Sequence, residues 1–171
     1  MPLSVTTIDN SNDFSSGRGF APFVDMNPQQ AKLKHEDLTE VVIKAFFDVY
    51  NELAGFPEFV LCRAMAIAIR DAALSVDEEV PLPVWFRGHQ IVKFKADLIV
   101  QSRVIVEVKA RPEVDPFNKA QVLHYLKATD LEVGLLLNFG RRPEFSRVIY
   151  ENARKSPRHV PPANDDSAKP A

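Results

Sequence analysis

Two short runs of alternating apolar and polar residues constrain this chain more than any other feature of its sequence. The runs are Lys95–Val100 and Val104–Lys109, and only the polar link Gln101-Ser102-Arg103 separates them. Alternation with a period of two is typical of β-strands, and a short polar link joins antiparallel neighbours, so the segment predicts a β-hairpin. Matching the apolar sides of the two runs pairs Val100 with Val104, Leu98 with Val106 and Ala96 with Val108.

The same register gathers charged side chains on the other face of the hairpin. Asp97 falls opposite Glu107, and Lys95 falls opposite Lys109. Like charges at opposite positions destabilise a hairpin, and a divalent cation between Asp97 and Glu107 relieves the repulsion. The pattern therefore predicts a metal site on one sheet face. The alternative is a solvated polar face, since Lys93 and Lys95 share it and polar-out strands are common.

The composition is that of one folded domain and gives no global sign of a partner. The 171 residues are 46% hydrophobic, and the net charge of -2 leaves nucleic-acid contact to a local basic patch. Cys62 is the sole cysteine, which excludes an internal disulfide and thiol-based zinc ligation and indicates a reducing compartment. The sequence shows no leader pattern and no run of about 20 apolar residues, so we expect a cytoplasmic protein without a membrane partner.

Periodicity along the chain predicts a mixed α/β fold with the element order ααβββαβ. Gly55 and Pro57 separate the first two helices. Residues 1–34 and 151–171 are rich in Ser, Asn, Asp and Pro, and we expect disordered tails there around one domain at 35–150. The expected helices are Leu38–Leu53, about 57–73 and about 117–129, and the expected strands are about 76–86, 90–100, 103–110 and 133–139, with an edge strand or short helix at 145–150.

The hairpin residues have the functional groups that metal-assisted phosphodiester hydrolysis needs. That reaction uses a metal ion, held by a few carboxylates and a backbone carbonyl, to acidify a water and neutralise charge on the phosphate. Asp97 and Glu107 supply carboxylates, and Val108 has a carbonyl to offer. Lys109, on the face of Glu107, is a candidate to orient the attacking hydroxide or to stabilise the transition state. We expect Mg²⁺ or Mn²⁺ as the ion.

One acidic residue on the second helix is a further candidate for this site. Glu58 lies one turn before an apolar stripe of Cys62, Met65 and Ile69, so we expect it to face inward. This position favours an inward-facing role, since a buried carboxylate needs a partner. The alternative is that an acid in a first helical turn is simply favoured by the helix dipole.

Polar residues of the last helix and basic residues of the hairpin complete the candidates. Gln121 and Tyr125 are four residues apart on one helix face, where they either orient water or a phosphate oxygen or are ordinary rim residues. Lys93 and Lys95, with Tyr125, are candidates for nucleic-acid contact. The alternative for scattered lysines is a solvated surface.

The core from about His35 to Tyr150 resembles the GxxExxY proteins, a small family within the PD-(D/E)XK nuclease superfamily. Leu61 stands where the name motif has Tyr, and Ala96 stands at the Pro of the superfamily's name. The stretches that carry the resemblance are Leu38-Thr39-Glu40, Gly55–Leu61, Val80–Val84, Lys95–Val100, Val106–Ala110, Ala120–Thr129 and Gly134–Gly140.

The resemblance implies a restriction-endonuclease-like core, with a central mixed sheet flanked by helices. It also implies that Asp97, Glu107 and Lys109 match the superfamily's metal-binding and catalytic triad, and that Glu58 and Gln121 match accessory positions. The expected function is that of a divalent-metal-dependent nuclease. DNA is the expected substrate, and other nucleic acids are the alternative. The competing expectations are a non-catalytic nucleic-acid-binding or assembly module, and a scaffold that binds a structural cation and forms a homodimer.

Overall fold

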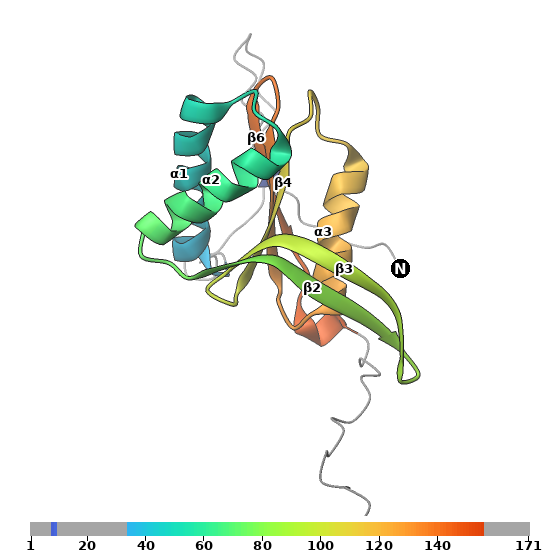
Figure 1. The fold of residues 1–171 in the computed structure, drawn as a ribbon. Helices are drawn as coiled ribbons and strands as arrows, with labels where there is room; N and C mark the ends of the chain where they lie inside the picture. The colour runs from blue at the N-terminus through green and yellow to red at the C-terminus, as the bar shows by residue number, and fades with distance from the viewer. Residues whose placement is uncertain (1–7, 10–33, 156–171) are drawn as a thin grey trace, which may run out of the picture.

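The predicted element order ααβββαβ is confirmed, and one further strand, β6, follows it. A computed structural model describes residues 8–9 and 34–155 (Figure 1). The segment at 145–150 belongs to a strand rather than to a helix. The elements are β1 (Ile8–Asp9), α1 (Glu36–Leu53), α2 (Glu58–Asp71), β2 (Val76–Phe86), β3 (His89–Val100), β4 (Val104–Lys109), α3 (Pro116–Ala128), β5 (Val133–Phe139), β6 (Pro143–Ile149) and the short 3₁₀ helix η1 (Asn152–Arg154).

The two predicted tails each contain a described element. The strand β1 lies in the predicted N-terminal tail and pairs antiparallel with β6. The helix η1 lies in the predicted C-terminal tail, where the Asn152 N–H donates to Glu132 Oε1 (2.5 Å) and Lys155 Nζ donates to the Leu131 carbonyl (2.6 Å). The other tail residues, 1–7, 10–33 and 156–171, lie outside the described residues, so disorder there stays a prediction.

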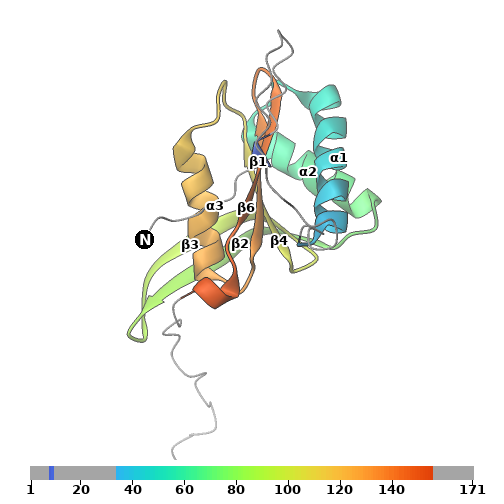
Figure 2. The same ribbon diagram turned by 180° about the vertical axis from the view of Figure 1, so that it is seen from behind.

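The strands form one mixed sheet with helices on both faces. Its order is β1-β6-β5-β4-β3-β2, and β4 and β5 are parallel, whereas the other neighbours are antiparallel. The parallel pair requires a crossover, which α3 provides. Figure 2 shows α3 on one side of the sheet and α1 and α2 on the other. Each face of the sheet has its own buried core. The strand β5, next to β4, lies between these two cores and is therefore buried along its whole length.

The predicted hairpin register holds over its inner part and then ends. Val100 pairs with Val104 and Leu98 with Val106, as predicted. The prediction was wrong beyond this point, because Asp97 does not pair with Glu107, Ala96 with Val108, or Lys95 with Lys109.

Two hydrogen bonds give the reason why β3 leaves β4. The Lys95 carbonyl accepts from the Tyr125 hydroxyl of α3 (3.0 Å), and the Val108 N–H donates to the Asp97 side chain (2.8 Å) instead of to the β3 backbone. Ala96 correspondingly packs in the core on the α3 face, whereas Leu98 packs on the opposite face. The two strands therefore open into a fork at Asp97.

A glycine of β5 allows α3 to pack closely on the sheet, and this gives a first prediction. A Cβ at Gly134 would lie 2.3 Å from Val122 Cγ1 of α3. We expect Gly134→Ala to lower the free energy of unfolding by about 1–3 kcal/mol, because overpacking forces the helix away. Urea unfolding measures this loss. The matched test is Val122→Ala in the Gly134→Ala background, which removes the clashing methyl and should recover part of the loss; strictly additive losses would contradict the explanation.

Candidate active site

The candidate site lies in the fork, where the Asp97 side chain replaces a backbone ladder bond. Asp97 Oδ2 accepts the Val108 N–H, so this carboxylate bridges β3 to β4. The N–H and C=O of one residue in a strand point to the same neighbouring strand. The Val108 carbonyl therefore also faces the fork rather than β5. The fork is where the sequence predicts a carbonyl ligand.

Glu107 is the most buried acidic residue of the site, and one of its oxygens has no partner. The residue is 1% exposed. Glu107 Oε1 accepts from Lys109 Nζ at 2.5 Å, whereas Oε2 is buried and has no hydrogen-bond partner. Leaving a buried acceptor unpaired costs about 1–3 kcal/mol, and more for a charged group. This burial excludes the solvated-face interpretation for Glu107.

Lys109 connects the hairpin to the start of α2. Its Nζ lies 3.6 Å from Glu58 Oε1 in addition to its contact with Glu107. Glu58 therefore faces the site, but its side chain is 41% exposed, so it is not the buried carboxylate that its position one turn before the apolar stripe predicts. The stripe itself was partly wrong, because Leu61 rather than Cys62 is buried beside Met65 and Ile69, and Cys62 is half-buried.

Burial and mutual repulsion shift the pKa values of the acidic groups. Burial, and then the neighbouring charge of Asp97, raises the pKa of Glu107 to about 7, against the opposing effect of Lys109. Burial also raises the pKa of Asp97, although the Val108 N–H and the Lys109 charge oppose this shift. Burial lowers the pKa of Lys109, but the Glu107 hydrogen bond and nearby carboxylates outweigh it, so the net shift is upward. Cation binding favours ionised carboxylates and relieves this repulsion.

A pocket of about 330 Å³ opens beside Asp97. Burial, and then the charges of Asp97 and Glu58, raises the pKa of the Cys62 thiol to about 12, so Cys62 is a neutral part of the wall. The pocket is lined by Glu58, Phe59, Cys62, Arg63, Glu78, Glu79, Lys95, Asp97 and Leu98.

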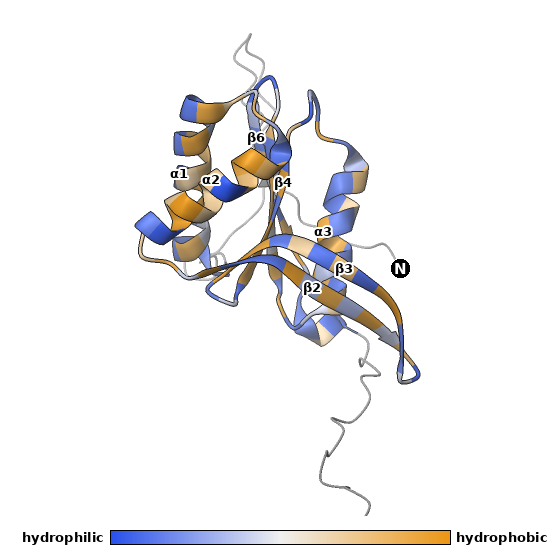
Figure 3. Ribbon diagram, viewed as in Figure 1, coloured by the Kyte–Doolittle hydropathy of each residue, from blue (hydrophilic) through white to orange (hydrophobic). Residues whose placement is uncertain are grey.

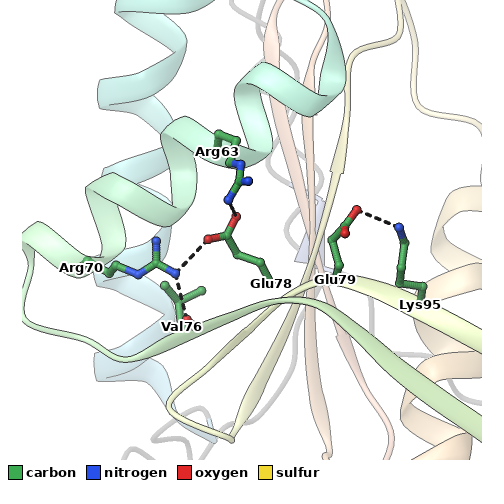
Figure 4. Close-up of polar contacts among 6 residues, drawn as sticks. All are labelled: Arg63, Arg70, Val76, Glu78, Glu79 and Lys95. Carbon is green, nitrogen blue, oxygen red and sulfur yellow. Dashed lines mark hydrogen bonds and ion pairs between the residues drawn. The ribbon is translucent and has the colours of Figure 1, made fainter.

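The sequence interpretation missed the charged residues on the edge of this pocket (Figure 4). Glu78 of β2 accepts from Arg63 and Arg70 of α2, each at 2.9 Å, and ties the edge strand to that helix. Glu79 pairs with Lys95 at 2.7 Å. Glu79 also has a left-handed backbone (φ 53°), a strained conformation for a non-glycine residue. Only the three consecutive acids at residues 77–79 signal this edge in the sequence.

Gln121 and Tyr125 form a chain of hydrogen bonds from α3 to β3. Gln121 Nε2 donates to Tyr125 Oη (2.5 Å), and the tyrosine hydroxyl donates to the Lys95 carbonyl. Tyr125 is only 3% exposed, so its placement favours holding β3 in position over the predicted contact with nucleic acid. Lys93 and Lys95 are exposed, as nucleic-acid contact requires.

The donor set fits a hard divalent cation held with few protein ligands. Within residues 34–155, no three His, Cys, Asp or Glu side chains are grouped so that they could hold a metal ion. Mg²⁺ is commonly held by one or two carboxylates and keeps several waters. The unpartnered Oε2 of Glu107, the Asp97 carboxylate and the Val108 carbonyl match that requirement.

The fold and this polar cluster define a restriction-endonuclease-like domain. A family model described as the PD-(D/E)XK nuclease superfamily matches residues 36–148, which is more than half of the chain and includes the fork. The chain belongs to the PD-(D/E)XK nuclease superfamily. The other comparisons find no matching curated protein and no matching solved structure. In the described part of the chain, no helix is long and apolar enough to cross a membrane.

Proposed function

We propose that this protein is a Mg²⁺- or Mn²⁺-dependent nuclease that hydrolyses phosphodiester bonds in DNA. The observation that carries the proposal is the buried, unpartnered Oε2 of Glu107 beside the Asp97 carboxylate. Membership in the nuclease superfamily supports the reaction class. Assignment to the GxxExxY family and a cytoplasmic location are part of the same proposal.

Each residue of the fork has a role in this reaction. Asp97, Glu107 and the Val108 carbonyl hold the ion, which when bound acidifies a water and neutralises charge on the phosphate. Lys109 orients the attacking water and stabilises charge on the phosphate in the transition state. Glu58 keeps the ammonium of Lys109 charged and in place, and Gln121 acts through Tyr125 to position β3.

One observation favours the competing function, a non-catalytic nucleic-acid-binding module. Leu61, at the position of the motif tyrosine, is 0% exposed and packs in the core between the sheet and the helices α1 and α2. The chain therefore has no hydroxyl at this position to contact a phosphate. A module of this kind predicts nucleic-acid binding without cleavage.

The deciding experiment measures thermal unfolding with and without millimolar Mg²⁺ or Mn²⁺, together with cleavage of supercoiled plasmid. We expect the metal to raise the Tm of the wild type and to support nicking, because a ligand that binds only the folded state stabilises it. Asp97→Ala should abolish both effects. Stabilisation without cleavage would favour the non-catalytic module, and the absence of both would contradict the metal site.

A further inference from the structure

The outer part of the β2–β3 hairpin projects beyond the rest of the sheet (Figure 1). The strand β4 pairs with β3 only from Leu98 to Val100, whereas β2 accompanies β3 to the tip, where Phe86 pairs with His89. We call residues 83–93 the arm. Among the described strands, none other than β2 and β3 pairs with the arm, so it is a two-stranded ribbon.

The arm is a narrow ribbon because its turn is tight. Both turn residues have left-handed backbones, Arg87 (φ 49°) and Gly88 (φ 80°). This geometry is that of a two-residue type I′ turn, whose twist matches that of the strands it joins. Phe94 and Leu82, just inside the arm, pack with Tyr125 in the core below α3, which anchors the base.

The surface of the arm is both apolar and basic. Phe86 is 53% exposed and Ile91 is 64% exposed, and the Arg87 guanidinium lies 5.1 Å from the centre of the Phe86 ring. Figure 3 shows hydrophobic colour along the arm and a hydrophilic turn. The arm contains Arg87 and Lys93 and no acidic residue, in a chain that has 23 acidic residues. The arm is therefore a local positive surface on an acidic protein.

We propose that the arm lies in a groove of double-helical DNA and clamps the duplex whose backbone enters the fork. This inference rests on the proposed nuclease function. The major groove of B-DNA admits a two-stranded β-ribbon, and Arg87 and Lys93 neutralise the flanking phosphates. A second copy of this chain is a poorer occupant, because the same arm would bring like charges together without an acidic partner.

The length of the arm defines how long the duplex has to be. His89 lies eight positions before Asp97 along β3. A strand advances about 3.3 Å per residue, so the tip lies about 26 Å from the fork. At about 3.4 Å per base pair, the arm contacts DNA about 8 base pairs from the cut phosphate.

The test compares a charge reversal in the arm with a matched reversal elsewhere. The arm variant is Arg87→Glu with Lys93→Glu, and the control is Lys44→Glu with Arg103→Glu, which changes two exposed residues outside the arm. Fluorescence anisotropy in EDTA measures binding to 8- and 24-base-pair duplexes, and cleavage of 30-base-pair duplexes is measured with Mg²⁺. We expect the arm variant to bind the 24-base-pair duplex at least tenfold more weakly, with a salt slope reduced by about 2, since each lost phosphate contact removes about 0.9.

The outcomes separate this inference from the proposed function. Weaker binding and cleavage of the long duplex by the arm variant alone, with an unchanged Tm, would support the clamp. Equal binding by the arm variant, the control and the wild type would overturn the clamp and leave the nuclease proposal standing. Duplex binding through the arm without any cleavage would support the clamp and contradict the nuclease. A shift from dimer to monomer in sedimentation, with DNA binding unchanged, would overturn the clamp and assign the arm to a second copy.

Discussion

Lys109→Met is expected to lower the rate of DNA cleavage by about 10²–10³-fold while the Mg²⁺-dependent rise in Tm persists. The ammonium lies between Glu107 and Glu58 and does not hold the ion. Its removal is therefore expected to take away the proposed transition-state stabilisation but to leave both carboxylates that are proposed to bind the metal. The measurement is kcat on plasmid DNA at saturating Mg²⁺, together with thermal unfolding of the same variant.

Lys95→Met is the matched control for this prediction. Lys95 lines the same pocket and is also paired to a glutamate, but its side chain is exposed and its partner is Glu79 at the rim. We expect this variant to raise KM with little change in kcat, because the proposed contact of Lys95 is with DNA rather than with the reacting phosphate. If Lys109→Met kept kcat within tenfold of the wild type, the catalytic role of Lys109 would be wrong.

The metal-free protein is expected to lose stability as the pH rises from about 5 to about 8. The pKa of Glu107 is about 7 in the folded protein, and the unfolded value is about 4.3. Between these values the folded state binds more protons than the unfolded state, so the free energy of unfolding falls with rising pH, by on the order of 3 kcal/mol. The raised pKa of Asp97 acts in the same direction.

Glu107→Gln should flatten most of this profile and make the metal-free protein more stable than the wild type at pH 8. Urea unfolding in EDTA at pH 5, 6, 7 and 8 measures the effect, and Glu113→Gln, the same change at an exposed loop position, is the control. Glu78, whose pKa is lowered by its bond to Arg70, contributes to the profile only at lower pH.

In the wild type, Mg²⁺ should stabilise the folded protein more strongly at pH 8 than at pH 5, because it binds the ionised carboxylates. A wild-type profile that stays flat or rises would contradict the buried-carboxylate explanation.

Most elements of the fold follow from local sequence patterns. The predicted bounds of β2 and β5 are those of the structure, and the helices agree to within a few residues. Local patterns suffice here because the apolar spacing of each segment shows which face is buried. The apolar register of β3 and β4 was also predictable as far as Leu98 and Val106, since a slip by one residue would expose the buried set.

The fork was not predictable from the hairpin pattern. Strict alternation continues through Lys95, yet the strands separate at Asp97, because a tyrosine 30 positions away bonds the Lys95 carbonyl. The same contact explains why Tyr125 is buried instead of lying on a helix rim. The pairing of Glu78 with Arg63 and Arg70 also depends on how α2 packs against the sheet edge.

The sequence by itself determined which residues are candidates for the chemistry, and the tertiary structure decided their environment. Residue spacing placed Asp97, Glu107 and Lys109 on one hairpin and Glu58 on the inner side of a helix, because strand and helix periods are local properties of the backbone. Burial of Glu107, its unpartnered oxygen and its raised pKa depend on the helices that cover both sheet faces. These helices bury Glu107 while a pocket stays open beside Asp97, and their packing raises the pKa values of both carboxylates.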